Sequence, residues 1–568
     1  MRRSHTMGAS GYVPTDRKPG HDDAQAPRPT PSILAAVAYV QESFTDEEAS
    51  LLSRYVSNVD RPVFALMQLP EVVKGALFAR YSRTSKSVRR LLLDEFIGDR
   101  DAAIAAIAEE VGTARAAQLY DRVFLEYGDD SVAQLGGVHL ACEQASNVLT
   151  KALEWGRLAS YLEQSTRYIP YDEPLGGRYR YTVPPEIARS PLADRFSALM
   201  DDLFSTYSEF VGALVPWFEA HHPKEEGDSD WVWRSTIRAK AFDTVRGMLP
   251  AATTSNLGIY ASGQAYEQAL IRLRSHPLEE AQEYAEMMLE ELRAVIPEFL
   301  TRVDRVDRGD AWGTYLSSVR RATEAKAAEL ADRAVPDRAE VTLVDWDPDA
   351  EVKLAAAAMY AGSELPDDVL LDVARGLSDE QLDDVFAAMV GERLNRRHKP
   401  GRAAERSTYR FDVLSDYGAF RDLQRHRLLT IEWQRLTTRH GYATPVALGE
   451  VGLADRWHDL MASAAELYED VRAALGPDVA QYVVPFAYRI RYMMQFNARE
   501  AFHLLELRTQ PAGHPDYRRV CQEMHRQIGE VAGHHRIQSA MSFVDHSTSD
   551  LERLEENRRI EARRSGGA

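Results

Sequence analysis

Two short stretches decide how this chain is understood: Glu163-Gln164-Ser165-Thr166-Arg167-Tyr168 and, far downstream, Arg425-His426-Arg427. In the first stretch, the Ser165 hydroxyl and the planar Arg167 guanidinium suit a phosphate group. The Glu163 carboxylate offers an acceptor to a ribose hydroxyl or an imide N–H. The second stretch groups cationic and titratable side chains, which can bind an anionic cofactor and polarise an electron-rich ring. Each stretch alone is equally typical of a turn or of a solvated basic edge.

The first stretch resembles the end of a signature found in flavin-dependent thymidylate synthases, Arg-His-Arg-x-x-Ser-x-Asn-Glu-x-Ser-x-Arg-Tyr. Residues 155–168 keep its third, sixth, ninth, eleventh, thirteenth and fourteenth positions. They lack the opening Arg-His, which is Trp155-Gly156 here, and the Asn, which is Leu162. Residues 425–435 keep the opening and a hydroxyl at Thr430, but lack the later Glu, Ser and Arg. The chain therefore resembles two copies of one domain, each altered where the other is intact.

Further family motifs divide between the copies in the same way. The Arg that precedes Leu-Pro is Arg246 in the first half, and Gln481 takes its place in the second. The Asn-x-Arg element of the flavin side is Asn497 and Arg499 in the second half, where the first half has Ser262 and Gln264. The final Leu-Arg is Arg508, or Arg274 with one residue of slippage. The resemblance predicts a nucleotide half followed by a flavin half.

The resemblance also implies which residues form the site. FAD would be held by Arg425, His426, Arg427, Asn497, Arg499 and His503. The nucleotide would be held by Glu163, Gln164, Ser165, Arg167, Arg246 and Arg508. Among these, Ser165, Arg167 and Arg508 would take part in catalysis, with Ser165 hydrogen-bonding the nucleotide rather than attacking it. No metal site is expected.

The implied reaction is reductive methylation of C5 of dUMP to give dTMP, with methylenetetrahydrofolate and NADPH as co-substrates and FAD as cofactor. The flavin would supply the electron chemistry, and the protein would supply orientation and charge. Two alternatives remain open: a non-catalytic paralogue that binds flavin or nucleotide, and the same chemistry on another pyrimidine nucleotide. A complete but altered site within the second half, using Thr437-Thr438-Arg439, ranks below a site shared by both halves.

A shared site requires the two signature segments to meet. C5 of the pyrimidine and the flavin must approach to about 3–3.5 Å for transfer to occur. We therefore expect Arg167 and Arg427 to face one cleft, within a chain or between chains. Because the family forms homotetramers, we expect a homodimer of this double-length chain to take the place of that tetramer.

Composition narrows the possible functions. The chain has 568 residues, of which 45% are hydrophobic and 27% charged, and its net charge is −19. This acidic balance disfavours a nucleic-acid partner, and no apolar run approaches the ~20 residues of a membrane helix. Two cysteines, Cys142 and Cys521, cannot form a disulfide framework and predict a cytoplasmic protein.

The predicted fold class is α+β and helix-rich, with two tandem domains of a small sheet and long helices, related by a pseudo-twofold axis. We place a disordered tail at 1–32, the nucleotide half at 33–305, a linker at 306–344 and the flavin half at 345–568. Hydrophobic periodicity predicts helices at 101–117, 193–218, 264–274, 279–296 and 454–475. We also expect a buried helix within 131–155, a strand at 410–414 and a solvated charged segment at 550–564.

Overall fold

The computed structural model describes residues 42–60, 64–71, 73–74, 77–78, 86–97, 134–167, 169–174, 177–331, 333–334, 336–548 and 550–565. The tail predicted at 1–32 and the helix predicted at 101–117 lie outside these residues. The chain forms two compact units. The smaller unit contains α2 (Asp46–Leu52), α4 (Val88–Leu91) and a π-helical turn, η1 (Leu92–Ile97). Within it, Arg90 pairs with Glu42 at 3.2 Å and with Glu48 at 2.7 Å.

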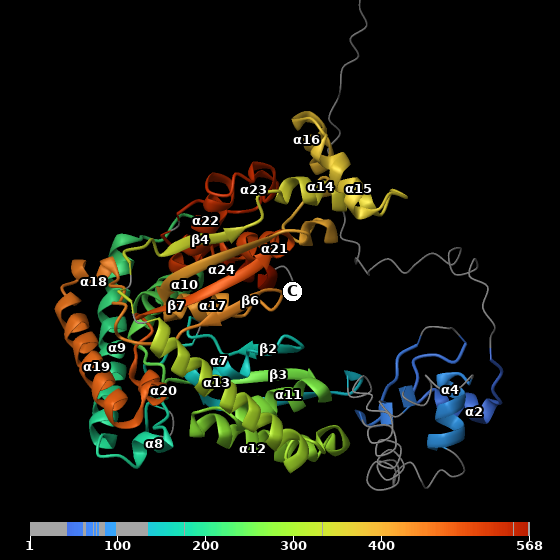
Figure 1. Cartoon of the computed structure of the whole chain (residues 1–568). Helices are drawn as coiled ribbons and strands as arrows, with labels where there is room; N and C mark the ends of the chain where they lie inside the picture. Colours follow the sequence, from blue (N-terminus) through green and yellow to red (C-terminus); the bar gives the residue numbers. More distant parts are fainter. Residues whose placement is uncertain are drawn as a thin grey trace, which may run out of the picture. The chain divides into compact units, whose positions relative to one another are not determined.

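The larger unit contains both signature segments, and its first half is built on a small antiparallel sheet (Figure 1). The strand order is β1-β3-β2. The elements are β1 (Gly137–Ser146), α7 (Asn147–Leu153), β2 (Ala159–Glu163), α8 (Pro185–Ala188), α9 (Ala193–His221), α10 (Asp230–Val245), η3 (Arg246–Met248), β3 (Thr254–Ser262), α11 (Gly263–Arg274), α12 (Glu279–Arg293), η4 (Pro297–Leu300), η5 (Val306–Asp310) and α13 (Ala311–Leu330).

The second half repeats this order. Its sheet is β4-β5-β7-β6, in which β5-β7-β6 corresponds to β1-β3-β2, and β4 forms an edge strand for which the described residues of the first half show no counterpart. Its elements are β4 (Val341–Trp346), α14 (Ala350–Tyr360), α15 (Asp367–Arg375), α16 (Asp379–Val390), η6 (Arg402–Glu405), β5 (Thr408–Asp416), α17 (Tyr417–Leu423), β6 (Thr430–Trp433), α18 (Val446–Glu450), α19 (Ala454–Leu475), α20 (Pro477–Ala480), η7 (Gln481–Val483), β7 (Arg489–Asn497), α21 (Ala498–Arg508), α22 (Pro515–Glu530), α23 (His535–Ala540) and α24 (Leu554–Ser565). The predicted fold class, with its two small sheets among long helices, is confirmed.

The two halves cross where η3 and η7 lead into their sheets, and the hydrogen bonds there show the pseudo-twofold relation. The Ala251 N–H donates to the Val484 carbonyl at 2.9 Å, and the Phe486 N–H donates to the Leu249 carbonyl at 2.9 Å. Each bond is the counterpart of the other, with the halves exchanged. The Leu-Pro segment of the first half therefore pairs, through backbone hydrogen bonds, with the Val-Pro segment of the second half.

Helices α9 and α19 extend the same symmetry at the surface, where they pack together (Figure 1). They begin with the related sequences Leu-Ala-Asp-Arg-Phe and Leu-Ala-Asp-Arg-Trp at 192–196 and 453–457. Arg195 of α9 pairs with Asp470 of α19, and Arg456 of α19 pairs with Asp202 of α9. This internal repeat was visible in the sequence and was missed.

One predicted element is confirmed and another is wrong. The buried helix expected within 131–155 is α7, which begins at Asn147 after the strand β1 (Gly137–Ser146), with the Ser146 hydroxyl accepting from the Leu149 N–H at 3.0 Å. The C-terminal segment is not simply solvated: α24 packs on α10, where the Asn557 amide donates to the Thr236 hydroxyl at 2.9 Å. The strand predicted at 410–414 is confirmed as part of β5.

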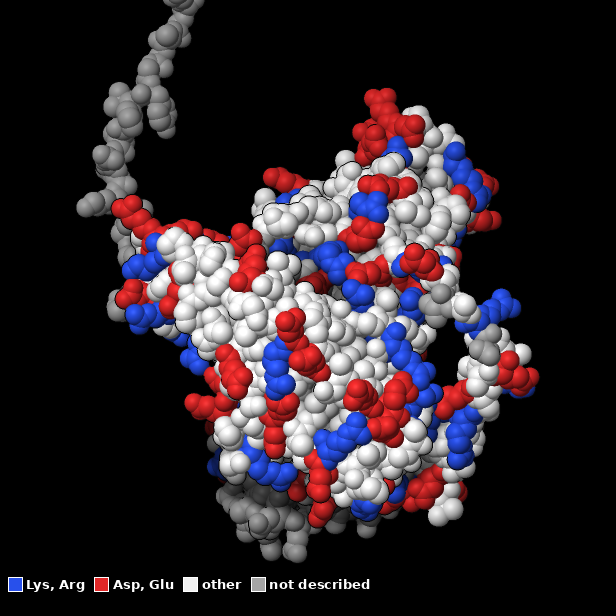
Figure 2. All heavy atoms as spheres, turned by 90° about the vertical axis from the view of Figure 1, so that its left-hand side faces the viewer, with Lys and Arg blue, Asp and Glu red and all other residues white. Residues whose placement is uncertain are grey.

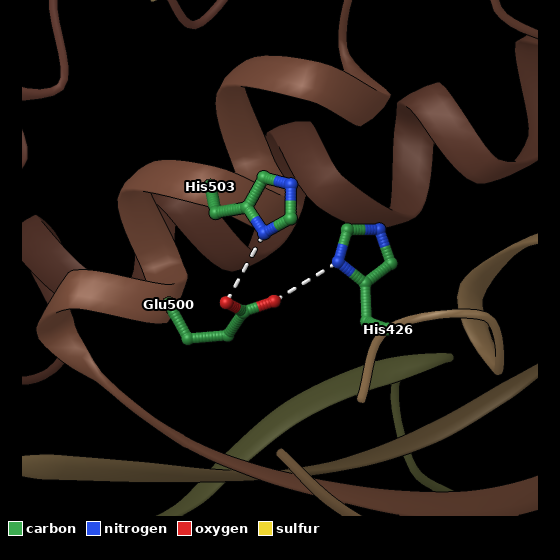
Figure 3. A group of neighbouring side chains, drawn as sticks. All are labelled: His426, Glu500 and His503. Carbon is green, nitrogen blue, oxygen red and sulfur yellow. Dashed lines mark hydrogen bonds and ion pairs between the residues drawn. The ribbon is translucent and has the colours of Figure 1, made fainter. Parts of the chain in front are cut away.

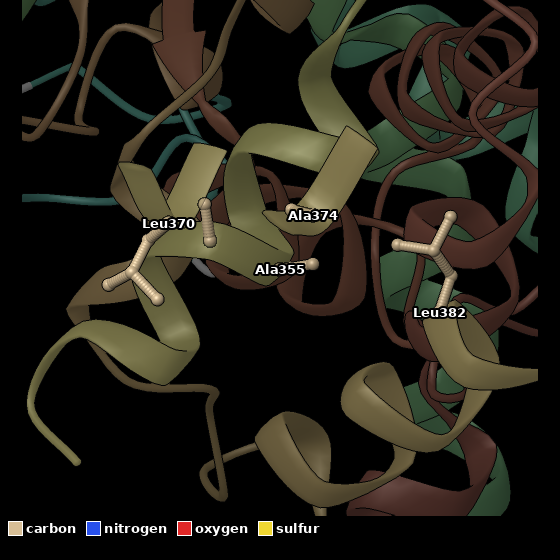
Figure 4. Packing of buried hydrophobic residues seen from close by; sticks show 5 residues of the cluster. Ala355, Leu370, Ala374 and Leu382 are labelled. Carbon is tan, nitrogen blue, oxygen red and sulfur yellow. The ribbon is translucent and has the colours of Figure 1, made fainter. Parts of the chain in front are cut away.

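Helices α14, α15 and α16 lie between β4 and β5 of the second half, and most of the corresponding stretch of the first half, before β1, lies outside the described residues. Small side chains allow their close packing, and Ala355, Leu370, Ala374 and Leu382 are buried together (Figure 4). On the face that carries α9, α18 and α19, basic and acidic side chains are intermixed (Figure 2). Among the described residues, no helix combines the length and the apolar character that crossing a membrane would require.

Candidate functional site

The two signature segments meet inside one chain, through an ion cluster around Glu163. This residue ends β2 and is fully enclosed. Its carboxylate accepts from Arg425 at 2.6 Å and from Arg421 at 3.0 Å, and Lys151 lies at 3.3 Å. Burial alone would raise the pKa of Glu163, but the three cations outweigh it and hold the pKa well below its ordinary value. Glu163 of the first copy is thus bound to the opening arginine of the second.

Predicted arginines from both halves also surround one carboxylate, that of Asp422 on α17. Arg246 lies at 3.6 Å from this carboxylate, Arg508 at 3.7 Å and Arg425 at 3.9 Å. Burial would raise the pKa of Asp422, yet the arginines lower it well below its usual range. These separations exceed hydrogen-bond length. The Nη2 of Arg246 and the Nε of Arg425 are buried without a hydrogen-bond partner in the described part of the chain. The cluster around the Asp422 carboxylate therefore holds two guanidinium nitrogens whose hydrogen bonds are unmade within the described residues.

Arg167 lies beside this cluster but is already engaged. Its guanidinium donates to the Asp243 carboxylate at 2.9 and 2.6 Å and to the Tyr517 hydroxyl at 3.1 Å. Only 8% of Arg167 is exposed. The Tyr517 ring lies between two cations, with the Arg167 guanidinium 5.9 Å and the Arg508 guanidinium 5.5 Å from its centroid. Ser165 accepts from the Arg167 N–H at 3.2 Å.

A cavity of about 390 Å³ lies between the openings of the two signature segments. The Arg427 guanidinium is 5.7 Å from the centroid of the Tyr161 ring, and Arg157 donates to the Thr430 hydroxyl at 3.1 Å. The lining consists of 154–159, Tyr161, four residues of α11 (Ala265, Gln268, Ala269 and Arg272), Gln424, His426, Arg427 and 429–432. Arg167 is absent from this lining. The expectation that Arg167 and Arg427 face one cleft therefore does not hold within the chain, because Asp243 draws Arg167 away.

His426, Glu500 and His503 form a hydrogen-bonded group (Figure 3), in which His426 lines the cavity and also contacts Arg508 of the arginine cluster. Nδ1 of His426 lies 3.0 Å and Nδ1 of His503 lies 3.2 Å from the Glu500 carboxylate. Arg508 donates from Nε to Nε2 of His426 at 3.0 Å, which requires the proton of the neutral imidazole on Nδ1. Burial lowers the pKa of His426 to about 4, and it stays neutral at physiological pH. The network orients Arg508 toward Asp422.

The same three side chains, His426, Glu500 and His503, could supply ligands to a divalent metal ion, since their ligand atoms lie within 4.8 Å of one another. No metal site was expected from the sequence. A metal on Nδ1 of His426 would move the imidazole proton to Nε2, which would then face the Arg508 donor. The contact from Arg508 thus favours a hydrogen-bond network over a metal site.

The remaining predicted residues lie away from the cavity. Asn497 caps α21, its side-chain oxygen accepting from the Glu500 N–H at 2.8 Å. Arg499 donates to the Pro400 carbonyl at 3.1 Å and lies 3.6 Å from Glu405. Gln164 is anchored through its backbone N–H, which donates to the Asn256 carbonyl at 2.8 Å. These contacts position helices and strands, and the predicted ligand-binding roles stay predictions.

Sequence reasoning missed six residues of the site: Lys151, Asp243, Arg421, Asp422, Glu500 and Tyr517. Two of them had a local signal. Arg421 stands one helical turn before Arg425 and therefore shares its face, and Glu500 stands one turn before His503. Asp243 and Tyr517 meet Arg167 from α10 and α22, so sequence spacing held no sign of them.

Comparison with known proteins agrees with this architecture. A family model described as thymidylate synthase complementing protein matches residues 76–298 and 342–533. A UPF0159 protein of Chlamydia muridarum is 39% identical over 525 residues, covering 91% of this chain and 99% of its own length. A UPF0159 protein of Thermoplasma acidophilum is 30% identical over 508 residues, covering 85% of this chain and 97% of its own.

Two shorter proteins also match. A flavin-dependent thymidylate synthase of Nitratidesulfovibrio vulgaris is 28% identical over 180 residues, which is 31% of this chain and 63% of that protein. A solved UMP/dUMP methylase, PolB of Streptomyces cacaoi bound with 5-Br dUMP, aligns with a TM-score of 0.28 and 17% identity, covering 37% of this chain and 99% of its own.

The structure thus shows a duplicated α+β domain with an arginine-rich cluster where its two copies meet. The chain belongs to the thymidylate synthase complementing protein family and carries the family's domain twice.

Proposed function

We propose that this protein is a flavin-dependent thymidylate synthase that methylates C5 of dUMP, using methylenetetrahydrofolate and NADPH through FAD. One observation carries the proposal: Arg246 of the first half and Arg425 and Arg508 of the second gather around the Asp422 carboxylate, beside a cavity lined by both halves. The arginines would bind the nucleotide phosphate and polarise the pyrimidine carbonyls.

The residues that line the cavity are chemically suited to contact a flavin ring. Arg427 and the Tyr161 ring offer a cation and an aromatic face, and His426 adds a neutral imidazole. Cations near the ring would stabilise the anionic reduced state. FAD, when bound, supplies the electron chemistry. The chain's own residues bind and orient the reactants, and the buried Glu163 cluster keeps Arg425 in place.

The direct test is dUMP methylation by purified protein with FAD, NADPH and methylenetetrahydrofolate. Arg508→Ala should lower turnover by about 10²-fold or more, since it removes a cation that faces the reacting groups. Arg274→Ala is the matched control, because Arg274 pairs with Glu286 and Asp310 away from the cavity. Absence of turnover in a protein that binds FAD and dUMP would favour the non-catalytic paralogue, which the engagement of Arg167 by Asp243 also supports.

We further propose that the protein acts in the cytoplasm as a homodimer that replaces a tetramer of single-domain subunits. Its two cysteines are unpaired and buried. Near the cavity, Leu158, Leu162 and Leu428 are 67%, 81% and 68% exposed. Such an apolar rim beside an edge strand suits a second copy of the chain. Light scattering should give twice the mass of the chain, and a monomer at micromolar concentration would contradict the proposal.

A further inference from the structure

Helix α13 (Ala311–Leu330) belongs to neither copy of the family domain, because it lies between the two matched segments, 76–298 and 342–533. Its 20 residues give it a length of about 30 Å. It packs on α11 (Figure 1), where the Ser317 hydroxyl and the Arg320 guanidinium donate to the Ser275 carbonyl at 3.3 and 3.1 Å. Yet α13, which the structure describes over its whole length, has no buried residue. One side of the helix is attached and the other is uncovered.

The uncovered side of α13 carries an apolar seam. Its residues, Trp312, Tyr315, Val319 and Ala322, follow one another with the spacing of a coiled-coil contact. Trp312, Tyr315 and Val319 are 43%, 62% and 45% exposed. On a helix of 3.6 residues per turn, the seam points away from Ser317, which faces α11. An apolar stripe of this kind is normally buried against another helix.

The second half shows the contact that α13 lacks. Helix α24 follows the second copy as α13 follows the first, and it packs on α10, where Asn557 is buried beside Thr236. In the second half α20 takes the place of α10, but it has 4 residues where α10 has 16. α13 meets α20 through Arg435, which pairs with Glu324 of α13 at 2.6 Å and with Asp478 of α20 at 2.7 Å. The chain thus covers α24 with a long helix and leaves α13 with its seam exposed.

The charges beyond the seam indicate what covers it. Lys326 and Glu329 continue the same face toward the C-terminal end of α13, and they pair with each other at 2.6 Å. This face is therefore aromatic at one end and charged at the other. A second, antiparallel α13 complements it, because a Lys stem covers apolar surface and its ammonium is attracted to an aromatic face. In a parallel pair, Lys326 would lie beside Lys326 of the partner subunit, and like charges repel.

We infer that the α13 seam binds the α13 seam of a second copy of this chain, with the two helices antiparallel about a twofold axis between Val319 and Ala322. Tyr315 then faces Lys326 of the partner subunit, and Trp312 faces Glu329 of the partner subunit. The inference rests on the proposed homodimer, and it names a contact between the copies that is separate from the apolar rim beside the cavity. Such a twofold contact is closed, so it joins two chains and no more.

Cross-linking of the full chain by a short bis-maleimide tests the contact, because both natural cysteines are buried. Val319→Cys lies next to the twofold axis and should be linked into a covalent dimer, with a yield at least tenfold above that of the control. The matched control is Arg321→Cys, at an exposed position on another side of α13. Denaturing gel electrophoresis reports both yields.

Two further variants test the orientation of the helices. Trp312→Cys alone should stay unlinked, because antiparallel helices hold the two copies of position 312 about 25 Å apart. An equal mixture of Trp312→Cys and Glu329→Cys should be linked, since these two positions face each other across the contact.

The inference is overturned if Val319→Cys is linked no better than Arg321→Cys, or if Trp312→Cys is linked to itself, which would make the pair parallel. Light scattering on the same samples separates this failure from a failure of the homodimer. A dimeric protein in which Val319→Cys stays unlinked would overturn the α13 contact alone, whereas a monomeric protein would contradict both proposals.

Discussion

The two halves of this protein have a similar backbone fold but differ in how their buried polar groups are hydrogen-bonded. At the start of η7, Gln481 uses both ends of its amide within its own half. At the start of η3, Arg246 reaches across to Asp422 of the other half and leaves Nη2 unpaired. In the second half, the polar side chain at this position forms its hydrogen bonds within that half, whereas in the first half one donor forms none within the described residues. Duplication thus allows one copy to keep stability while the other keeps binding capacity.

The same division appears at the end of the second strand of each signature. Glu163 ends β2 as a buried hub for three cations, whereas Trp433 ends β6 at the equivalent position. The hub joins the halves, since Lys151 comes from the first and Arg421 and Arg425 from the second. The two copies therefore carry different charges at equivalent positions of their interface.

The largest expected effect comes from breaking this hub. Glu163→Gln leaves Lys151, Arg421 and Arg425 without their shared counter-charge and should lower the free energy of unfolding by about 3–5 kcal/mol. Urea denaturation measures this. Glu432→Gln, at an exposed position of β6, is the control and should stay within about 0.5 kcal/mol. A Glu163 variant as stable as the control would show that the halves do not depend on the hub.

Asp416 should make the stability of the second half depend on pH. Burial and the nearby Asp516, opposed by Arg246, raise its pKa to about 7, so the folded state holds a proton that the unfolded chain releases. Stability from this group is present below about pH 4 and is lost as the pH rises to about 7.

Asp416→Asn removes this dependence, and the variant should gain about 2–4 kcal/mol relative to the unaltered protein between pH 4 and pH 8. Thermal unfolding at a series of pH values measures the difference. Asp412→Asn, on the same strand but paired with Arg491 at 2.7 Å, is the comparison and should show no such gain. Parallel pH curves for the Asp416 variant and the unaltered protein would contradict the assignment.

FAD binding should depend more strongly on Arg427 than on its counterpart Arg157. Arg427→Ala loses a charge-assisted contact worth about 1.5–3 kcal/mol, so FAD retention should fall about tenfold or more. Arg157 already donates to Thr430, and its loss should cost about threefold or less. Absorbance of the retained flavin after gel filtration reports both values. Equal losses would mean that the copies share the flavin symmetrically.

The surface ion pairs between α9 and α19 should show the smallest effect; their arginines occupy equivalent positions of the two helices, whereas their acidic partners do not. Arg195→Ala and Arg456→Ala each remove one exposed pair and should cost about 0.2–1 kcal/mol. The two values should agree within about 0.5 kcal/mol, as measured by urea denaturation. A cost above about 1 kcal/mol for either variant would show that the contact contributes more than an exposed ion pair.

Much of the fold could be predicted because helical periodicity and motif order are local properties. The helix at 454–475 and the strand within 408–416 follow from such patterns. Failures came where tertiary contacts decide. β1 was not predicted: only the buried helix within 131–155 was expected, and β1, which pairs with β3 along most of its length, precedes that helix. The charge-rich α24 packs on α10 through Asn557 and Thr236, a contact between distant segments.

The site was predictable only in part, for the same reason. The signature identified Glu163 and Arg425, and the structure joins them at 2.6 Å. Arg167 was expected to hold a ligand, but Asp243 binds it, and nothing in the spacing of these residues indicates the pair. A signature locates a site, whereas the counter-charges that tune it come from other elements.

The most direct test of a site shared by the halves is a crystal structure of the protein with FAD and 5-bromo-dUMP, located by the anomalous signal of bromine. We predict one bromine position per chain, between the signature segments, with the phosphate bound by Arg246, Arg425 and Arg508. Two positions per chain, one in each half, or a single position away from Arg425 and His426, would contradict the account.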